Sequence, residues 1–306
     1  MLVRAVQAAD LPALLALARC TGVGVTSLPA NEARLAKRVA ASLASMAADL
    51  AAHDSSFLFV LEDTSSGQVV GICGLEGAVG GHEPWYNYRV GLTVKASHEL
   101  QIYRCLTTLC LTNDLTGASE LCSLFLHPDW RKQRNGALLS KARFLFLAEF
   151  PHRFAPLVIA EMRGVSDEQG RSLFWESLGR HFFSMEFSEA DYLTGVGDKS
   201  FIAELMPQHL VYTAFLSPAA QAVIGEVHQA TRPARALLES EGFRYNGFVD
   251  IFDAGPTLAC ELQQIRAVRD SHVVMVTAAV TEQAITADAV LYLVSNRRLA
   301  DVCYRF

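Results

Sequence analysis

Apolar side chains recur every three or four positions in several segments of this chain, which is the period of an α-helix. Asp10 precedes the first such segment as its expected N-cap, and Pro12 suits the first helical turn. A further helical region is expected between residues 201 and 266. The predicted helices before it are residues 11–20, 35–50, 136–149 and 172–179.

Other apolar runs are shorter, are rich in branched or aromatic side chains, and are bounded by turn residues, so they predict strands. Residues 64–67 are expected to form the turn of a hairpin, and the last forty residues carry only weak strand patterns. The alternation of strands and helices indicates an α/β sheet packed by helices, antiparallel at first and partly parallel later. The predicted strands are residues 1–6, 57–63, 68–79, 87–94, 120–126, 156–164 and 181–187.

Two local patterns allow more than one interpretation. Residues 172–187 and 234–252 share a short helical pattern, a glycine and an aromatic-rich run, which indicates either a structural near-repeat or a coincidence. The Gly-Val-Gly of residues 22–24 follows a predicted helix rather than a strand. It therefore predicts a helix end and a turn, not a dinucleotide-binding loop.

Composition narrows the class of protein. The chain is 51% hydrophobic and 19% charged, so its 306 residues can bury a full core. A net charge of −6 disfavours a general nucleic-acid-binding protein, and no apolar run approaches the roughly 18 residues of a membrane span. No two of the seven cysteines have the C-x-x-C spacing of a zinc or redox site. The first residues of the chain do not have the pattern of a signal peptide. We expect reduced cysteines buried in the core of a cytoplasmic protein, with Cys122 inert.

Three cations lie in one short turn between a predicted strand and a predicted helix. Arg131, Lys132 and Arg134 follow the strand at 120–126 and precede the helix at 136–149. Backbone N–H groups at a helix N-terminus, together with the helix dipole, form an anion site. The alternative is an ordinary solvated surface turn.

The order of elements around this turn resembles the acyl-CoA N-acyltransferase (GNAT) superfamily, whose pyrophosphate loop reads Arg/Gln-x-x-Gly-x-Gly/Ala. The matching residues here are 131–136, with Arg134 in place of the first glycine. Glycine accepts positive φ more readily than arginine does, so the diphosphate either sits differently or contacts Arg134 directly. The resemblance implies CoA contacts at Arg131, Lys132, Arg134, Asn135 and Gly136.

Longer blocks resemble one family within that superfamily, the arginine N-succinyltransferases. They include TSLPANE (26–32), PWYNYRVG (84–91), SELCSLFL (119–126), AEMRG (160–164), EGFRY (241–245) and DIFDAGPT (250–257), and the similarity runs from residue 1 to about 270. The resemblance implies a GNAT-type α/β (α+β) fold, a mixed sheet packed by helices with an additional C-terminal GNAT-like or β-rich region. It also implies a core at residues 1–200, a continuation at 201–266 and a short C-terminal extension at 267–306.

The family reaction implied is the transfer of succinyl from succinyl-CoA to L-arginine, giving N2-succinyl-L-arginine and CoA, the first step of arginine catabolism by the succinyltransferase route. A guanidinium stays protonated at neutral pH, whereas an α-amine with a pKa near 8 can lose its proton and react. The resemblance implies no permanently bound cofactor or metal, and a homodimer or an α/β hetero-oligomer. The alternatives are an acyltransferase for ornithine or for another acyl-CoA, and a subunit with little activity alone.

The resemblance also assigns residues to this reaction. His228 matches the catalytic histidine, a proton donor, although an ordinary capping histidine is the alternative; His127 ranks second. Leu124 and Leu126, at the end of their strand, are expected to meet the acyl-CoA arm through backbone groups. Candidates for the two charged ends of the substrates, each also explicable as a structural ion pair, are Arg89 and Arg163 for the succinyl carboxylate and Glu161, Asp250 and Asp253 for the guanidinium.

Overall fold

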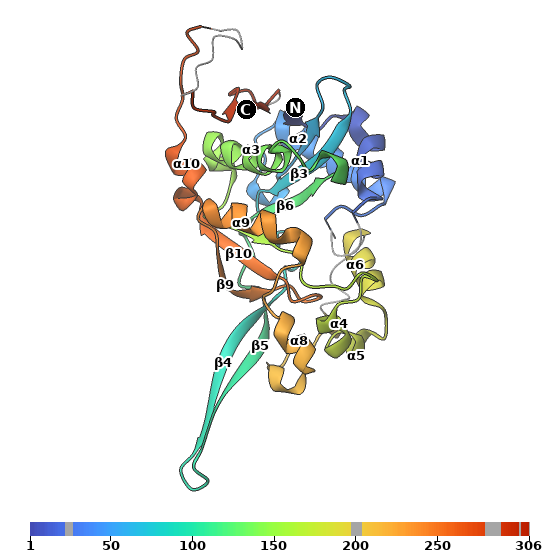
Figure 1. Cartoon of the computed structure of the whole chain (residues 1–306), viewed down its shortest axis with the longest axis vertical. Helices are drawn as coiled ribbons and strands as arrows, with labels where there is room; N and C mark the ends of the chain where they lie inside the picture. The colour runs from blue at the N-terminus through green and yellow to red at the C-terminus, as the bar shows by residue number, and fades with distance from the viewer. Residues whose placement is uncertain (22–26, 197–203, 279–288, 300, 306) are drawn as a thin grey trace.

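The computed structural model describes residues 1–21, 27–196, 204–278, 289–299 and 301–305, so the glycine-containing residues 22–24 lie outside the described part. Its strands form one sheet in the order β11-β12-β1-β2-β3-β6-β7-β10-β9-β4-β5-β8 (Figure 1). The strands are β1 (Leu2–Ala5), β2 (Ser56–Glu62), β3 (Val69–Glu76), β4 (Asn87–Ser97), β5 (Ile102–Thr112), β6 (Ser119–Leu126), β7 (Leu157–Glu161), β8 (Val211–Tyr212), β9 (Arg244–Val249), β10 (Pro256–Glu261), β11 (Val294–Ser295) and β12 (Cys303–Arg305).

Helices pack on both faces of this sheet. Two short 3₁₀ turns, η3 (Pro128–Trp130) and η6 (Gln229–Thr231), precede helices that matter for the site. The α-helices are α1 (Leu11–Ala18), α2 (Glu32–Ala47), α3 (Asn135–Glu149), α4 (Leu173–Ser177), α5 (Arg180–Phe183), α6 (Phe187–Val196), α8 (Pro218–Val223), α9 (Arg232–Ser240) and α10 (Arg266–Asp270).

The first half of the sheet has α1 and α2 against one face and α3 against the other. Helix α2 buries Leu35 and Val39, as the apolar period predicted, and two of its serines bond the backbone at the start of β2. Ser42 Oγ accepts the N–H of Leu58 at 2.8 Å, and Ser45 Oγ accepts the N–H of Ser56 at 3.0 Å. Apolar burial thus holds the helix on the sheet, and the serines fix its position along the strand.

Helix α3 is buried on more sides than an amphipathic surface helix would be. Arg143 lies in the interior on the side of the sheet, where its Nη1 donates to the Cys122 carbonyl of β6 at 3.5 Å, and α10 packs against α3 as well. Fully buried Glu241, just after α9, joins the three helices: it accepts hydrogen bonds from Lys141 at 2.9 Å and from Arg266 at 2.7 Å.

A second core lies between β4, β5, β9 and the helices α4, α5, α6 and α8. Here the strand predicted at residues 181–187 is wrong, because this segment ends α5 and begins α6. Phe183 and Phe187 both pack on Trp175, with ring centroids 5.3 and 6.4 Å away. The near-repeat with residues 234–252 is therefore wrong as well, since only that second segment continues as a helix and a strand, α9 and β9.

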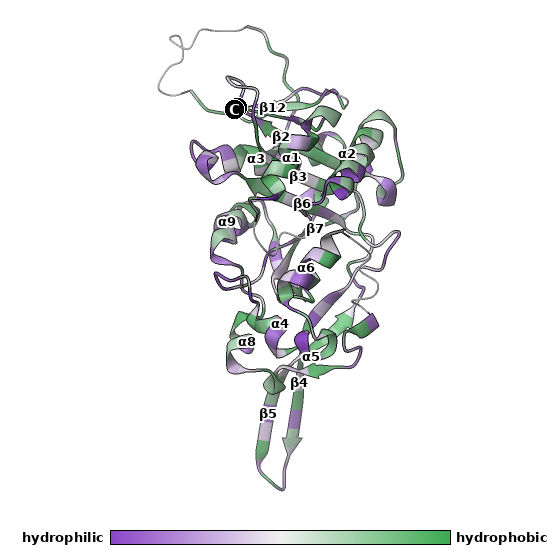
Figure 2. Ribbon diagram, turned by 90° about the vertical axis from the view of Figure 1, so that its right-hand side faces the viewer, coloured by the Kyte–Doolittle hydropathy of each residue, from purple (hydrophilic) through white to green (hydrophobic). Residues whose placement is uncertain are grey.

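The longest hairpin of the fold consists of β4 and β5. Strand β4 runs to Ser97 and pairs along its whole length with β5, which the pattern did not predict. The hairpin projects from the body in both Figure 1 and Figure 2. Burial of the cysteines is confirmed for Cys73, Cys122 and Cys260 and is wrong for three others, Cys20, Cys105 and Cys110, which are exposed.

Neighbouring strands are antiparallel except β6 and β7, so the expected parallel pairing is limited to one pair of strands. Strands β9 and β10, from beyond residue 201, lie between β7 and β4 in the sheet. The division into residues 1–200, 201–266 and 267–306 stays a prediction.

Candidate active site

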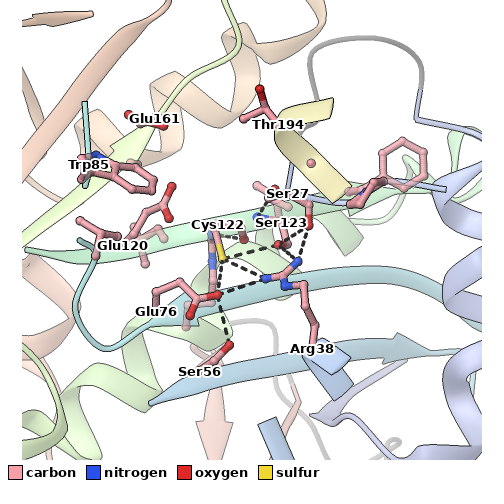
Figure 3. Close-up of a pocket in the computed structure, with 18 of the residues that line it drawn as sticks. Ser27, Arg38, Ser56, Glu76, Trp85, Glu120, Cys122, Ser123, Glu161 and Thr194 are labelled. Carbon is pink, nitrogen blue, oxygen red and sulfur yellow. Dashed lines mark hydrogen bonds and ion pairs between the residues drawn. The ribbon is translucent and has the colours of Figure 1, made fainter. Parts of the chain in front are cut away.

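Strands β6 and β7 separate soon after they begin, and a large cavity opens beside them (Figure 3). Their parallel pairing is confined to Ser119 with Val158 and Glu120 with Ile159. A cavity of about 780 Å³ is lined by the rest of β6, by the end of β7 and by parts of α2, α9 and the loop after β3. The gap therefore gives an extended ligand access to backbone groups of β6.

Strand β6 carries a bulge in the wall of this cavity. Phe125 pairs with Ile72 and Cys122 pairs with Gly74, so Ser123 and Leu124 together oppose Cys73. Ser123 has a φ of 55°, in the left-handed region that a serine rarely adopts. The bulge takes Leu124, which lines the cavity, out of the regular ladder with β3.

Arg38 of α2 fastens the bulge to the rest of the site (Figure 3). Its Nη1 donates to Ser123 Oγ at 2.9 Å and to the Ser27 carbonyl oxygen, and its Nη2 donates to Glu76 Oε1 at 3.2 Å. The N–H of Ser123 in turn donates to Ser27 Oγ at 3.1 Å. These bonds connect α2, β3 and β6 at the floor of the cavity.

The thiol of Cys122 lies beside this clamp. Burial, reinforced by Glu76, raises the pKa of the Cys122 thiol to about 12. The group therefore stays protonated at neutral pH and is a poor nucleophile. This agrees with the expectation that Cys122 is buried and inert.

The basic turn leaves β6 through η3 and enters α3. Arg134 has a φ of 63° and is the N-cap of α3, so arginine does adopt the conformation for which the superfamily loop uses glycine. Arg131 lines the large cavity and donates from Nε to the Leu126 carbonyl at 3.1 Å. Arg131, Lys132, Arg134 and Gly136 are exposed around this helix N-terminus.

Two of the residues that were expected to contact the acyl-CoA have buried side chains. Asn135 is buried and donates to the Trp130 carbonyl at 3.0 Å, which closes the turn. Leu126 is buried in the main core and pairs with Gly71. Any contact of these two residues with a cosubstrate would therefore use the backbone.

His228 lies next to the cavity without lining it. Its N–H donates to the Arg163 carbonyl at 2.9 Å, and Ala230 and Thr231 just after it do line the cavity. Its Nδ1 accepts the N–H of Ala230 at 3.2 Å, so Nε2 carries the hydrogen in the neutral ring. Burial, followed by the charge of Arg163, lowers the pKa of the His228 imidazole below the ordinary 6.5.

His127 has the same local role at the other 3₁₀ turn. Its Nδ1 accepts the N–H of Asp129 at 3.4 Å, but it is not among the residues that line the cavity. The second-ranked histidine is thus a capping residue close to the basic turn.

A smaller cavity of about 60 Å³ adjoins the large one and shares Glu161, Met162 and Arg163 with it. Asp253 is deeply buried in its wall and accepts the N–H groups of Gly164 at 2.7 Å and Gly255 at 2.8 Å. Burial, then the charge of Asp250, raises the pKa of the Asp253 carboxyl well above its usual range. The acidic residues of the wall are Glu161, Asp191, Asp250 and Asp253.

Arg163 separates the two cavities, and burial lowers the pKa of its guanidinium. It donates to Ser166 Oγ at 2.9 Å. Arg89 lies elsewhere, at the base of the β4–β5 hairpin, paired with Asp114 at 3.5 Å and placed over the Phe248 ring. The structure therefore brings together Glu161, Arg163, Asp250 and Asp253, and leaves Arg89 outside both cavities.

The clamp residues Arg38, Glu76 and Ser123 were not expected from the sequence. The available signal was the polar stripe of α2, where Arg34 and Arg38 are four positions apart and both line the cavity. Ser123 gave no signal, because neither glycine nor proline marks its bulge.

Within the described part of the chain, no helix combines the length and the apolar character needed to span a bilayer. The same described residues include no group of three or more His, Cys, Asp or Glu side chains that could hold a metal ion.

Comparison with known proteins identifies the family. The profile described as "Arginine N-succinyltransferase beta subunit" matches residues 1–267. The chain is 59% identical over 301 residues to "Arginine N-succinyltransferase subunit beta" of Pseudomonas aeruginosa, covering 98% of this chain and 87% of that protein. It is 59% identical over 276 residues to "Arginine N-succinyltransferase" of Enterobacter sp. (strain 638), covering 90% and 80%.

A solved structure shares the fold. The arginine/ornithine succinyltransferase subunit AI from Pseudomonas aeruginosa superposes with a TM-score of 0.89 at 38% identity, covering 99% of this chain and 87% of that one. The expected α/β fold, a mixed sheet packed by helices, is confirmed. The chain therefore belongs to the arginine N-succinyltransferase family of acyltransferases.

Proposed function

We propose that this protein transfers the succinyl group of succinyl-CoA to the α-amine of L-arginine. The observation that carries the proposal is the bulge of β6, which takes Leu124 out of the ladder with β3 in the wall of a cavity large enough for an acyl-CoA arm and a second substrate. The choice of succinyl as the acyl group and of arginine as the acceptor rests on the names of the relatives.

The basic turn is the proposed seat of the CoA diphosphate. The N-terminus of α3 has no side-chain cap, so the N–H group of Gly136 and the helix dipole favour an anion there, whereas the N–H of Asn135 already donates to the Lys132 carbonyl at 3.0 Å. The side chains of Arg131, Lys132 and Arg134 add positive charge. From this seat the pantetheine arm follows β6 past Leu126, and the thioester carbonyl meets the N–H of Leu124, which stabilises the developing oxyanion.

The acceptor spans the two cavities in this proposal. Its guanidinium enters the small cavity, where Glu161, Asp250 and Asp253 supply carboxylates, and its α-amine reaches back into the large cavity. Burial, then the charge of Asp250, raises the Asp253 pKa, and a bound cation offsets both effects by stabilising the ionised carboxyl. Arg163, at the boundary, is better placed than Arg89 to bind the succinyl carboxylate.

The chemistry is a direct acyl transfer. The uncharged amine nitrogen attacks the carbonyl carbon, the C–S bond breaks, and one proton passes overall from nitrogen to sulfur. Attack turns the amine into an ammonium, and the proton that it then releases ends on the departing sulfur. His228 is neutral with Nδ1 occupied by the Ala230 N–H, and it acts as the donor by hydrogen-bonding its Nε2–H to the departing thiolate until that proton arrives. Cys122 forms no acyl intermediate in this scheme, because its thiol is protonated.

A thiol-release assay tests the activity: purified protein receives succinyl-CoA or acetyl-CoA with L-arginine or L-ornithine. Release that requires succinyl-CoA and arginine supports the proposal. Preference for ornithine supports the second candidate, which the words "arginine/ornithine" in the name of the solved relative favour. No release with any pair, from folded protein that binds CoA, would refute activity of the isolated chain and indicate a subunit that needs a partner.

Residue roles are tested with matched variants. His228→Ala should lower kcat by about 10²–10⁴-fold, whereas His127→Ala, which removes the same kind of cap outside the cavity, should change kcat less than about threefold. Glu161→Gln should raise KM for arginine by roughly 10–100-fold through loss of a charged hydrogen bond, with KM for succinyl-CoA unchanged. An equal loss in both histidine variants would contradict the role of His228.

The proposal also includes a cytoplasmic location and an assembly of more than one chain, either a homodimer or an α/β hetero-oligomer. The word "subunit" in the names of two relatives supports the assembly.

A further inference from the structure

We propose that the distal part of the β4–β5 hairpin, residues 91–107, binds the same segment of a second copy of this chain. This segment is called the arm below. The contact uses one face of the arm, and it forms whether or not the proposed acyl transfer is correct.

The arm extends beyond the rest of the sheet. Among the described residues, β4 pairs with β9 only at Tyr88 and Arg89, and β5 pairs with β8 only at Thr108 and Leu109. Beyond these positions β4 and β5 pair only with each other in the described structure, and both views show them leaving the body. A two-stranded hairpin is marginally stable in water without a third strand or a packed face. The arm is therefore expected to have a partner.

One face of the arm is apolar and exposed. Side chains alternate between the faces of a strand, and directly paired residues share a face. Leu92 is 65% exposed, Val94 47% and Tyr103 65%. Toward the base the same face continues into fully buried Tyr88 and Leu109 of the second core. The residues of the apolar face are Leu92, Val94, Ala96, Tyr103, Cys105 and Thr107.

The distribution of charge indicates which face of the arm forms the contact and favours a second copy of the chain as its partner. The apolar face carries no ionisable acid or base apart from Tyr103 and the Cys105 thiol, so two copies can face each other without like-charge repulsion. On the opposite face Lys95 lies directly across from Arg104, and a second copy of that face would bring four cations together. An apolar face that is complementary to itself is what a twofold, isologous interface requires.

The length of the arm fits an antiparallel contact between two copies. The seven residues from Gly91 to Ser97 extend roughly 24 Å at about 3.4 Å per residue, so the tip of one arm reaches the base of the other. Exposed apolar residues occur there too: Phe215 is 87% exposed and Leu210 44%. A stable interface buries roughly 800 Å² per partner, so the contact should continue from the arm onto these residues at the base.

Sedimentation velocity of the purified full chain over a concentration series tests the proposal. The expected mass is twice 33.4 kDa, about 67 kDa. Leu92→Glu combined with Val94→Glu should raise the dimer dissociation constant at least 100-fold. The control, Thr93→Glu combined with Ser97→Glu, adds the same charge to the opposite face of the same strand and should change the constant less than threefold. Near-ultraviolet circular dichroism checks that each variant folds.

Two native thiols give a second readout without any variant. Cys105 is on the apolar face and Cys110, paired with Arg89, is on the other; both are exposed in the single chain. Iodoacetamide should label Cys105 at least tenfold more slowly in concentrated than in dilute protein, with Cys110 labelled equally fast in both. A monomer at all concentrations, a dimer that tolerates the apolar-face variant, or equal protection of both thiols would each overturn the proposal.

Discussion

Replacing Arg38 with methionine should impair the chemical step while leaving CoA binding intact. The variant keeps the length and apolar stem of the side chain and removes the guanidinium that bonds Ser123, Ser27 and Glu76. The basic turn, where we place the CoA diphosphate, lies on a different element. The bulge of β6 should therefore lose its clamp without loss of the CoA seat.

The magnitude follows from the conformation of Ser123. A non-glycine residue in the left-handed region costs on the order of 1–3 kcal/mol, which its surroundings must offset. Hydrogen bonds from a charged donor contribute about 1.5–3 kcal/mol. Loss of about 2–3 kcal/mol from the clamp lowers the population of the bulged state by roughly 30–150-fold. We expect kcat to fall by about the same factor, which overlaps the lower end of the roughly 10²–10³ expected for complete loss of an oxyanion-hole donor.

The assay is steady-state kinetics with succinyl-CoA and arginine, together with CoA binding by calorimetry and a thermal melt. Arg38→Lys keeps one cation beside Glu76 but cannot span all three partners, so it should fall between wild type and Arg38→Met. Lys37→Met removes a neighbouring cation that lines the cavity and should keep kcat within about threefold. A folded Arg38→Met enzyme with kcat within threefold of wild type would refute the clamp.

Further predictions concern protonation, the basic turn and two glycines. Protonation of His228 at Nδ1 would break its bond with the Ala230 N–H and release the ring, so kcat/KM should fall as the pH drops through the His228 pKa. Burial lowers that pKa below 6.5, so the acid limb should lie below 6.5, and Arg163→Met should move it to higher pH. Arg134→Gly relieves about 1–2 kcal/mol of left-handed strain in the folded chain but costs about 0.5–1 kcal/mol through the larger entropy of the unfolded chain, so the free energy of unfolding should change by less than about 1.5 kcal/mol. The same variant should bind CoA roughly 3–10-fold more weakly because it loses one cation of the basic turn. In Gly255→Ala the new Cβ would overlap backbone atoms, and a loss above about 3 kcal/mol is expected, whereas Gly136→Ala, with its nearest neighbour 3.9 Å away, should gain up to about 1 kcal/mol in a urea titration.

Elements with long, bounded apolar runs could be predicted from the sequence. Strands β2, β3 and β6 are buried along most of their length, and burial is what a continuous apolar run reports. Strand β5 was missed because it is mostly exposed and mixes threonine and cysteine with leucine. Residues 181–187 were misassigned because aromatic content was taken as a strand signal, although both aromatic side chains pack on Trp175 from the end of one helix and the start of the next.

The site was predictable to the extent that a family resemblance marks its residues. Leu124, Glu161 and Arg163 line the large cavity and His228 adjoins it, yet no periodicity in the sequence shows that these segments meet. The clamp around Arg38 was missed because its partners come from elements separated by as many as 96 residues. Its central feature, positive φ at a serine, has no signature in residue type.

The strand order also determines when neighbouring strands can pair while the chain is synthesised on the ribosome. Strand β4 joins the sheet through β9, and 244 − 112 = 132 positions separate the end of β5 from the start of β9. At about 5–20 residues per second, roughly 7–26 s pass before β9 exists, whereas a hairpin closes within about 1–10 μs. The hairpin of β4 and β5 is therefore complete before β9 can pair with β4, and during this interval the apolar side chains at its base are uncovered. Nascent-chain chaperones should protect it during this interval, and two neighbouring unfinished chains could join through it before either one has a finished site.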